Sequence, residues 1–214
     1  MSQYATYNDF RGAVLLMLDG DEVPSNHSPH TVDQMISLGE SLVHDGEQTG
    51  IRGLPVGPLR ASSMEAVLSL TAADNAVALP ADCMGLRIAW FDSRRPLEVV
   101  PEDRLLANSY GGGIPYQMAQ AGDTLIFNGP AADGDVLHGR YYQRPTALKD
   151  GLHATFNRYP DLYLYAALYS ASPFLGFDRR IPVWQSYYQS LLHQANNAER
   201  WRVHGGSSLK QVAR

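Results

Sequence analysis

The apolar residues of this chain follow helical spacing at both ends and strand-like alternation in the middle. Near the N-terminus, Thr6 and Asp9 have the spacing of a capping signal, and the apolar residues that follow share one helical face: Phe10, Val14, Met17 and Leu18. Ser28 and Pro29 then predict the N-cap and first position of a second amphipathic helix, whose apolar face comprises Val32, Met35, Ile36, Leu42 and Val43. Glycines and prolines up to position 58 end this periodicity.

Residues 59–150 contain short runs rich in β-branched and aromatic residues. The runs NAVALP, LRIAWFD, RPLEVV and DVLHGRYYQ predict strands, and PYQMAQAGDTLIFNG predicts a hairpin that turns near residues 121–123. The intervening PEDRLLANS predicts one or two helical turns that start at Pro101 or Glu102. We therefore expect a small antiparallel β domain over this segment.

The densest aromatic segment, NRYPDLYLYAALYSASPFLGFDRR, comes after the β segment. Pro160 predicts the start of a helix, and Asp178 predicts the cap of a last helix. The last helix carries apolar residues at spacings of three and four: Ile181, Trp184, Tyr188, Leu191, Ala195 and Ala198. Two helices joined by the short segment SPFLGFD predict an antiparallel hairpin over residues 151–200, in which Ala166 and Ala167 allow close approach.

Together these patterns predict an α+β protein. Its helical bundle combines the N-terminal helices and loop of residues 1–58 with the helix hairpin of residues 151–200. The antiparallel β domain of residues 59–150 is inserted between these two parts. Residues 201–214 form an extended C-terminal tail. The 214 residues, 44% of them hydrophobic, suffice for a substantial core. The single cysteine excludes an internal disulfide, and the lack of a long apolar run or a signal-peptide pattern predicts a soluble protein.

Charge is distributed unevenly along the chain. The net charge is −5, yet residues 1–50 hold eight acids against one base, and residues 200–214 hold four bases and no acid. This pattern is too weak for a face that binds duplex DNA, but two ends of opposite sign could attract each other or separate partners. The chain has two lysines against fifteen arginines, which favours packed interfaces.

No combination of residues indicates catalysis or metal binding. His27 and His30 lie in a polar loop without an HExxH context, and the glycines at 111–113 lack the lysine and hydroxyl residue of a phosphate loop. No serine occupies a G-x-S-x-G elbow, and acid pairs such as Glu102 with Asp103 lie in turn-like segments. We therefore predict a protein that is not an enzyme and has no catalytic residues, metal ligands or cofactor.

The run RYPDLYLYAALYSASPFL is followed by an amphipathic helix, AERWRVHGG and a short basic tail. This order of segments resembles the head-to-tail adaptor proteins of tailed double-stranded DNA bacteriophages, which are also called connector or head-completion proteins. The central strands of that family are also similar to segments of this chain: ALPADCMGLRIAWFD, RPLEVVPEDRL, GDTLIFNGP and DGDVLHGRYYQRPTAL. The resemblance therefore covers roughly residues 28–206. Its strongest motif is the start of the tyrosine-rich helix: Tyr159, Pro160, Asp161, Leu162, Tyr163 and Tyr165.

The resemblance implies a structural protein of the virion neck that is assembled in the host cytoplasm. Such adaptors form a twelve-subunit ring beneath the portal protein ring, extend the channel through which genome DNA passes without sequence-specific contact, and provide the platform for tail or nozzle proteins. A head-to-tail ring needs two different faces on each subunit, which the acidic N-terminal third and the basic C-terminal tail could supply.

The C-terminal tail is the predicted portal-docking segment. Its GGSS sequence cannot bury enough apolar surface to hold a fixed shape, so we expect the tail to be disordered in the isolated subunit and to fold against the portal. Its apolar anchors and basic residues are Arg200, Trp201, Arg202, Val203, Leu209, Lys210, Val212 and Arg214. Alternatively, Trp201 caps the end of the helix hairpin.

Two other functions are compatible with an aromatic-rich chain. A virion-associated carbohydrate-active enzyme would need a deep pocket with two facing carboxylates. A single-stranded nucleic-acid-binding module would need its tyrosines exposed in a basic groove, whereas Tyr159, Tyr163 and Tyr169 are interleaved with leucine and alanine. We therefore expect most of these tyrosines to pack in the core and the remainder to face neighbouring subunits.

Overall fold

The computed structural model describes residues 3–18, 29–46, 57–91, 95–108, 113–132, 134–175 and 178–204. The chain divides into two compact units, a helical unit formed by residues 1–63 with 145–214 and a β unit formed by residues 64–144. The predicted mixed α+β class is therefore confirmed.

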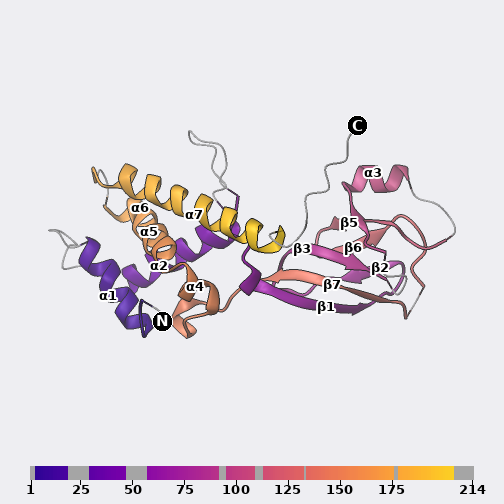
Figure 1. Cartoon of the computed structure of the whole chain (residues 1–214), viewed down its shortest axis with the longest axis horizontal. Helices are drawn as coiled ribbons and strands as arrows, with labels where there is room; N and C mark the ends of the chain where they lie inside the picture. The colour runs from indigo at the N-terminus through magenta and orange to yellow at the C-terminus, as the bar shows by residue number, and fades with distance from the viewer. Residues whose placement is uncertain are drawn as a thin grey trace. The chain divides into compact units, whose positions relative to one another are not determined.

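Figure 1 shows the helices and strands of both units, coloured along the chain. The helical unit contains α1 (Tyr7–Leu18), α2 (Pro29–Asp45), η2 (Leu148–Asp150), α4 (Ala154–Arg158), α5 (Pro160–Ser170), α6 (Ser172–Leu175) and α7 (Ile181–His204), and the short turn η1 (Ser62–Met64) precedes the β unit. The β unit contains β1 (Glu65–Thr71), β2 (Ala76–Ala78), β3 (Cys83–Trp90), β4 (Glu98–Val99), α3 (Glu102–Ala107), β5 (Gln117–Ala121), β6 (Thr124–Phe127) and β7 (Val136–Gln143).

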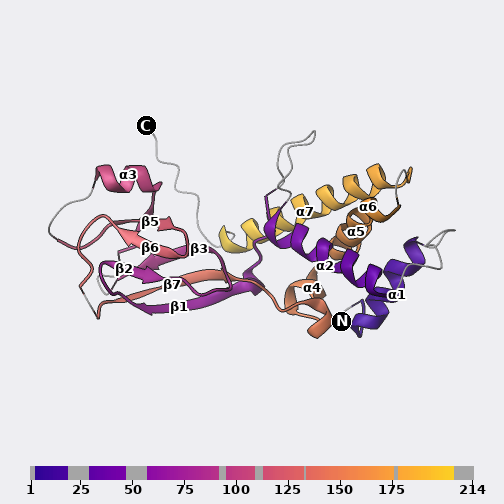
Figure 2. The same ribbon diagram turned by 180° about the vertical axis from the view of Figure 1, so that it is seen from behind.

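The tyrosine-rich helix α5 is the centre of the helical unit. It packs against α1, α2 and α7, which Figure 2 shows from behind. Helices α5 and α7 run antiparallel, because Tyr169 stacks on Tyr188 whereas Tyr159 reaches Glu199, further along α7. Helix α2 packs directly on the backbone of α5 at Gly39, where an added Cβ would lie 2.6 Å from the backbone nitrogen of Ala167. Ala166 and Ala167 of α5 therefore allow close packing against α2. The sequence instead predicted that these alanines allow close packing between the two C-terminal helices.

The N-terminal helix follows its predicted cap and most of its predicted face. The backbone N–H of Thr6 donates to Asp9 Oδ2 at 2.8 Å, and the backbone N–H of Asp9 donates to Thr6 Oγ1 at 3.2 Å, which is the reciprocal geometry of a capping box. Phe10, Val14 and Leu18 are buried. Met17 was predicted on the same face, but its side chain is 39% exposed, so this prediction is wrong. Met17 lies at the edge of the row that Phe10, Val14 and Leu18 form at spacings of four residues.

The buried stripe of α7 is shifted from the predicted one in its second half. The buried stripe includes Trp184, Tyr188 and Ala195, as predicted. Between Tyr188 and Ala195 the buried residue is Leu192 rather than Leu191. At the end of the stripe Glu199 is buried, whereas the predicted Ala198 is exposed. An acidic side chain at the end of an apolar row is tolerated only when donors satisfy it. Arg158 and Tyr159, just before α5, and Ser62 of η1 supply them.

The β unit contains two small sheets, and their strand pairs are antiparallel as predicted, except that β4 pairs with β5 in parallel. The three-stranded sheet has the order β1-β7-β3 and is antiparallel, and the four-stranded sheet has the order β2-β6-β5-β4. Strand β4 pairs with β5 in parallel, because helix α3 connects the two strands as a crossover on the sheet's outer face. The hairpin of β5 and β6 turns at Gly122 and Asp123, as predicted, with a positive φ of 63° at Gly122.

The inner faces of the two sheets share one apolar core. Its members come from both sheets and include Leu68, Leu137, Met118, Leu125 and Phe127. On the far side of the four-stranded sheet, a smaller cluster joins Leu105 of α3 to Val100, Ala119 and the partly buried Ile126. Helix α3 therefore covers the outer face of the four-stranded sheet.

The β unit is shorter at both ends than the predicted segment 59–150. Leu59 is buried in the helical unit, and its N–H donates to the carbonyl of Val43 at 2.9 Å. At the other end Leu148 is also buried, and its N–H donates to the carboxylate of Glu40 at 2.8 Å. These anchors on α2 assign both connecting segments to the helical unit.

Candidate assembly surfaces

The tyrosines of α5 connect helices within the unit. Tyr163 is buried, and its hydroxyl lies 3.3 Å from His44 Nε2 of α2. Tyr165 stacks on Tyr187 of α7 with ring centroids 5.0 Å apart, and Tyr169 stacks on Tyr188 in the same way at 6.1 Å. Rings that stack on other tyrosines of the same unit are engaged in helix packing, which disfavours a base-stacking platform.

The remaining motif tyrosine, Tyr159, helps to hold the C-terminal end of α7 through Glu199. The Tyr159 hydroxyl donates to Glu199 Oε1 at 2.6 Å, Arg158 Nη1 donates to the same oxygen at 3.0 Å, and the N–H of Ser62 donates to Oε2 at 2.9 Å. Glu199 is only 2% exposed. Burial opposes its ionisation, but the hydrogen bonds from Tyr159, Ser62 and Arg158 outweigh burial and lower the pKa of Glu199 to about 2.

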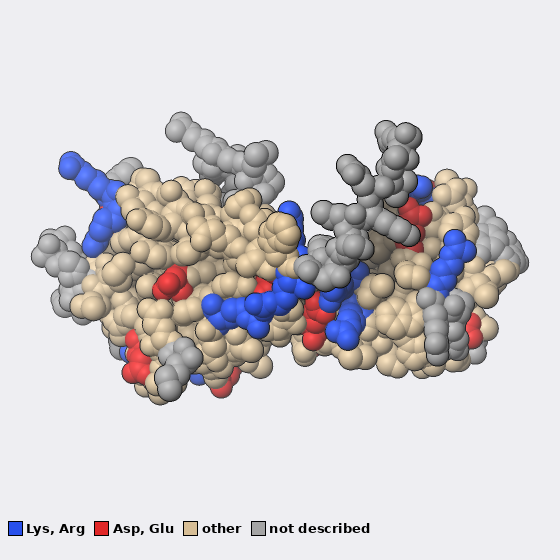
Figure 3. Space-filling model, viewed as in Figure 1, with Lys and Arg blue, Asp and Glu red and all other residues tan. Residues whose placement is uncertain are grey.

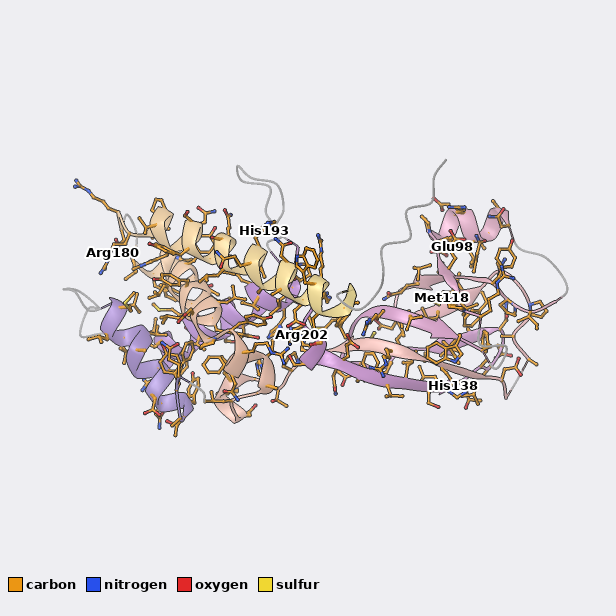
Figure 4. All side chains as sticks on the ribbon, viewed as in Figure 1. Glu98, Met118, His138, Arg180, His193 and Arg202 are labelled. Carbon is orange, nitrogen blue, oxygen red and sulfur yellow. The ribbon has the colours of Figure 1, made fainter. Side chains whose placement is uncertain are left out.

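The first part of the predicted docking tail is helical. Helix α7 continues to His204, so an extended tail that begins at residue 201 is wrong for residues 201–204, and Arg200 likewise lies within the helix. The helix continues because no breaker precedes Gly205 and because Glu199 is anchored within this last part of α7. Figure 4 labels Arg202 near the end of α7, and its Nη1 donates to Glu199 Oε1 at 3.5 Å.

The last turns of α7 present apolar and basic side chains to solvent. Trp201 is 76% exposed, Val203 is 39% exposed, and Arg200 is exposed beside them. The other predicted docking residues lie outside the described residues: Leu209, Lys210, Val212 and Arg214. An exposed tryptophan on an anchored helix is a candidate contact residue for a protein partner.

The other motif residues of α5 have structural positions. Pro160 occupies the first turn of α5, Leu162 is buried, and Asp161 is exposed. The sequence motifs do not point to Glu199, Arg158 or Ser62. Glu199 could have been found, because it continues the spacing of Trp184, Tyr188, Leu192 and Ala195, and an acid on a buried row implies a nearby donor.

A second polar cluster in the helical unit joins α2, α5 and the residue that precedes α4. The rings of His44, His153 and Tyr163 are about equally spaced, with centroids 5.6 to 6.0 Å apart. His153 Nδ1 accepts the N–H of Phe156 at 3.1 Å and caps α4, and burial lowers the pKa of His153 to about 4. On α2, burial raises the pKa of Glu40 to about 7, against the lowering effect of the Leu148 N–H.

Neither polar cluster has the composition of a metal site. Among the residues that the structure describes, no group of three or more His, Cys, Asp or Glu side chains is placed to hold a metal ion. The described helices also include none that is long and apolar enough to cross a membrane. Both clusters instead connect segments that are distant in the sequence.

Much of the surface in Figure 3 carries neither acidic nor basic side chains. Large apolar side chains are exposed on the outer faces of the helical unit as well as at the end of α7, with Leu16 at 76%, Val183 at 52% and Tyr187 at 53%. Single exposed apolar side chains are normal on protein surfaces, so these three residues assign no function by themselves.

A known family matches most of the chain. The family model described as SU10 adaptor protein matches residues 5–209, which is nearly the whole chain and both units. No curated protein matches the chain.

Proposed function

Because the chain belongs to the SU10 adaptor protein family, a family of structural phage proteins, we propose that it is the head-to-tail adaptor of a tailed phage. In this role it forms a ring of twelve copies under the portal protein ring in the virion neck, after assembly in the host cytoplasm. The ring extends the channel through which genome DNA passes without sequence-specific contact. Its far side is the platform for tail or nozzle proteins.

The observation that carries the docking part of this proposal is the exposure of Trp201. Its side chain is 76% exposed although the helix that bears it is anchored through the buried Glu199. Tryptophan and arginine are the residues most enriched at the energetic centres of protein interfaces, and Arg200 and Arg202 flank Trp201. The last turns of α7 therefore form a pre-ordered anchor for the portal, and residues 205–214 extend it.

The residues of this extension have complementary roles. Leu209 and Val212 supply apolar contacts that become buried only when a groove is provided, since the adjoining GGSS sequence cannot cover them. Lys210 and Arg214 attract acidic portal surface and increase the rate of encounter more than the final affinity. Several tails that bind one portal ring together give a strong attachment from weak individual contacts.

Native mass spectrometry tests the proposal directly. The purified chain is measured alone and after mixing with portal rings, and we expect a defined number of copies on each portal ring. Trp201→Ala should weaken portal attachment at least tenfold, whereas the control Val183→Ala, which trims an exposed side chain on the same helix, should not. Deleting residues 205–214 should also weaken attachment. A chain that ignores portal rings would refute the adaptor role, and normal attachment of Trp201→Ala would refute docking through α7.

A further inference from the structure

The segment that leads into the β unit, residues 59–63, is bonded to the last part of α7. We call this segment the connector. The backbone N–H of Ser62 donates to Glu199 Oε2 at 2.9 Å, and the N–H of Arg60 donates to Asn196 Oδ1 at 3.4 Å, three residues earlier on α7. Arg158 Nη1 donates to Ser62 Oγ at 3.2 Å and to Glu199 Oε1 at 3.0 Å. One carboxylate therefore joins α7 to a residue that lies 137 positions away in the sequence.

The connector is also held by α2 and α4. Arg60 Nη1 donates to the carbonyl of His44 at 3.0 Å, and Ser63 Oγ lies 2.8 Å from Thr155 Oγ1. Because the bonds to His44 and Thr155 do not involve α7, they hold the Ser62 N–H in place for Glu199.

Glu199 is the point at which the packed part of α7 ends. It is 2% exposed, whereas residues 200–203 are all exposed. The turn that carries Trp201 therefore has its nearest buried anchor in Glu199. Helix ends fray unless contacts hold them, and a carboxylate stays buried only while its donors are in place. Loss of these donors would release Glu199 to water and loosen the turn that follows it.

Docking and the hydrogen bonds of Glu199 favour the same state of this turn. A partner that binds Trp201 on a helix needs the turn to be ordered, and order that exists beforehand removes a free-energy cost from binding. The bonds of Glu199 supply that order. Two interactions that favour one state strengthen each other by an equal factor, whichever forms first.

We propose that Glu199 is a positioning residue that links portal docking at Trp201 to the connector. Docking stabilises the hydrogen bond between Ser62 and Glu199, and that bond strengthens docking. This inference rests on the proposed docking of α7 to the portal. It adds residues that act on docking through the order of the helix end rather than by contact with the portal.

Tyr159→Phe tests the link with a small chemical change. It deletes the hydroxyl that donates to Glu199 Oε1 at 2.6 Å and keeps the ring. Tyr187→Phe is the matched control, because it removes a hydroxyl from a 53% exposed tyrosine of α7. Hydrogen exchange by amides 200–203 of the free chain and the affinity for portal rings are measured. Tyr159→Phe should speed this exchange and weaken binding, each roughly fivefold or more, whereas Tyr187→Phe should match the wild type.

Ser62→Pro repeats the test from the connector, because proline lacks the N–H that Glu199 Oε2 accepts. Ser62 is the first residue of η1, where the fixed φ of proline suits a helical turn. This variant should also weaken portal binding roughly fivefold or more. In the wild type, portal binding should slow exchange of the Ser62 amide by a similar factor.

The amides of α5 serve as the reference for overall stability. Weaker portal binding by Tyr159→Phe and Ser62→Pro with unchanged exchange in α5 supports the inference. Normal binding by both variants, an equal acceleration of exchange in α5, or portal binding that leaves the Ser62 amide unprotected overturns it. In these cases weaker binding by Trp201→Ala still supports docking through α7, whereas a wild-type chain that ignores portal rings overturns both.

Discussion

Gly39 of α2 lies against the backbone of α5, where a methyl group has no space. A Cβ at this position would lie 2.6 Å from the nitrogen and 2.8 Å from the Cα of Ala167, and 2.9 Å from the carbonyl carbon of Ala166. All three are backbone atoms, so no side chain can rotate away. In Gly39→Ala the two helices must therefore separate or distort. Gly12 in α1 is the matched control, because a Cβ there meets nothing within 4 Å.

The structure gives the two substitutions opposite signs. Alanine is favoured over glycine in a helix interior by about 1 kcal/mol, so Gly12→Ala should stabilise the protein by up to that amount. At Gly39 the same gain is opposed by overpacking, which costs about 1–3 kcal/mol in cores and more when only backbone can move. The separation also loosens the packing of Val32, Met35 and Ile36, which are buried on α2. We expect Gly39→Ala to lose about 2 kcal/mol of unfolding free energy.

Urea and thermal denaturation followed by circular dichroism at a helix-sensitive wavelength measure both variants. For a chain of this size, about 1 kcal/mol corresponds to roughly 2–4 °C, so Gly39→Ala should lower Tm by about 4–8 °C and Gly12→Ala should raise it by about 2–4 °C. The helix signal reports mainly on the helical unit, which contains both glycines. A Gly39→Ala protein as stable as Gly12→Ala would mean that α2 and α5 do not make this backbone contact.

Three other outcomes follow from buried side chains of the helical unit. Trp184→Ala should cost on the order of 3 kcal/mol through cavity formation, whereas Gln185→Ala on the less buried neighbouring position should cost little; equal unfolding midpoints would contradict this. Glu199 has a folded pKa of about 2, so its stabilisation is present above its unfolded pKa and is lost as the pH falls toward 2. Glu199→Gln should therefore be less stable at pH 7 by about 1–3 kcal/mol and should lose less stability on acidification, as urea denaturation across pH would show. Folding disfavours protonation of His153, so its contribution makes stability fall as the pH drops from about 6.5 to about 4. The raised pKa of Glu40 has the opposite effect, because its contribution makes stability fall as the pH rises from about 4.5 to about 7. These trends oppose each other in the wild type, and Glu40→Gln should expose a rise in stability of about 1–2 kcal/mol between pH 4.5 and 6.5; a flat profile in Glu40→Gln would refute the assignment.

Local patterns of the sequence determined much of the secondary structure. The capping box of Thr6 and Asp9, the proline at the start of α5 and the turn at Gly122 each depend on residues that are adjacent or one helical turn apart, so their chemistry can be read without tertiary contacts. Helical and strand periodicity likewise distinguished the helical ends from the β segment, because each records which side of an element is buried. The tryptophan on α7 was recognised as a contact candidate for the same reason, since it falls outside the apolar row.

The arrangement of these elements depended on contacts between distant residues. Strand β1 was not identified as a separate strand, because its partner β7 lies about seventy residues further along the chain, and the division into two sheets follows from such pairings rather than from the pattern of any one strand. Glu199 acquires its role only when Ser62, Arg158 and Tyr159 converge on it. The side of the β unit that α3 covers is likewise not determined by any single segment, because stacking of two sheets places β7 and α3 on opposite sides. A sequence specifies the chemistry of each residue and its nearest neighbours, whereas the distance between residues far apart in the chain is set by which apolar faces pack together.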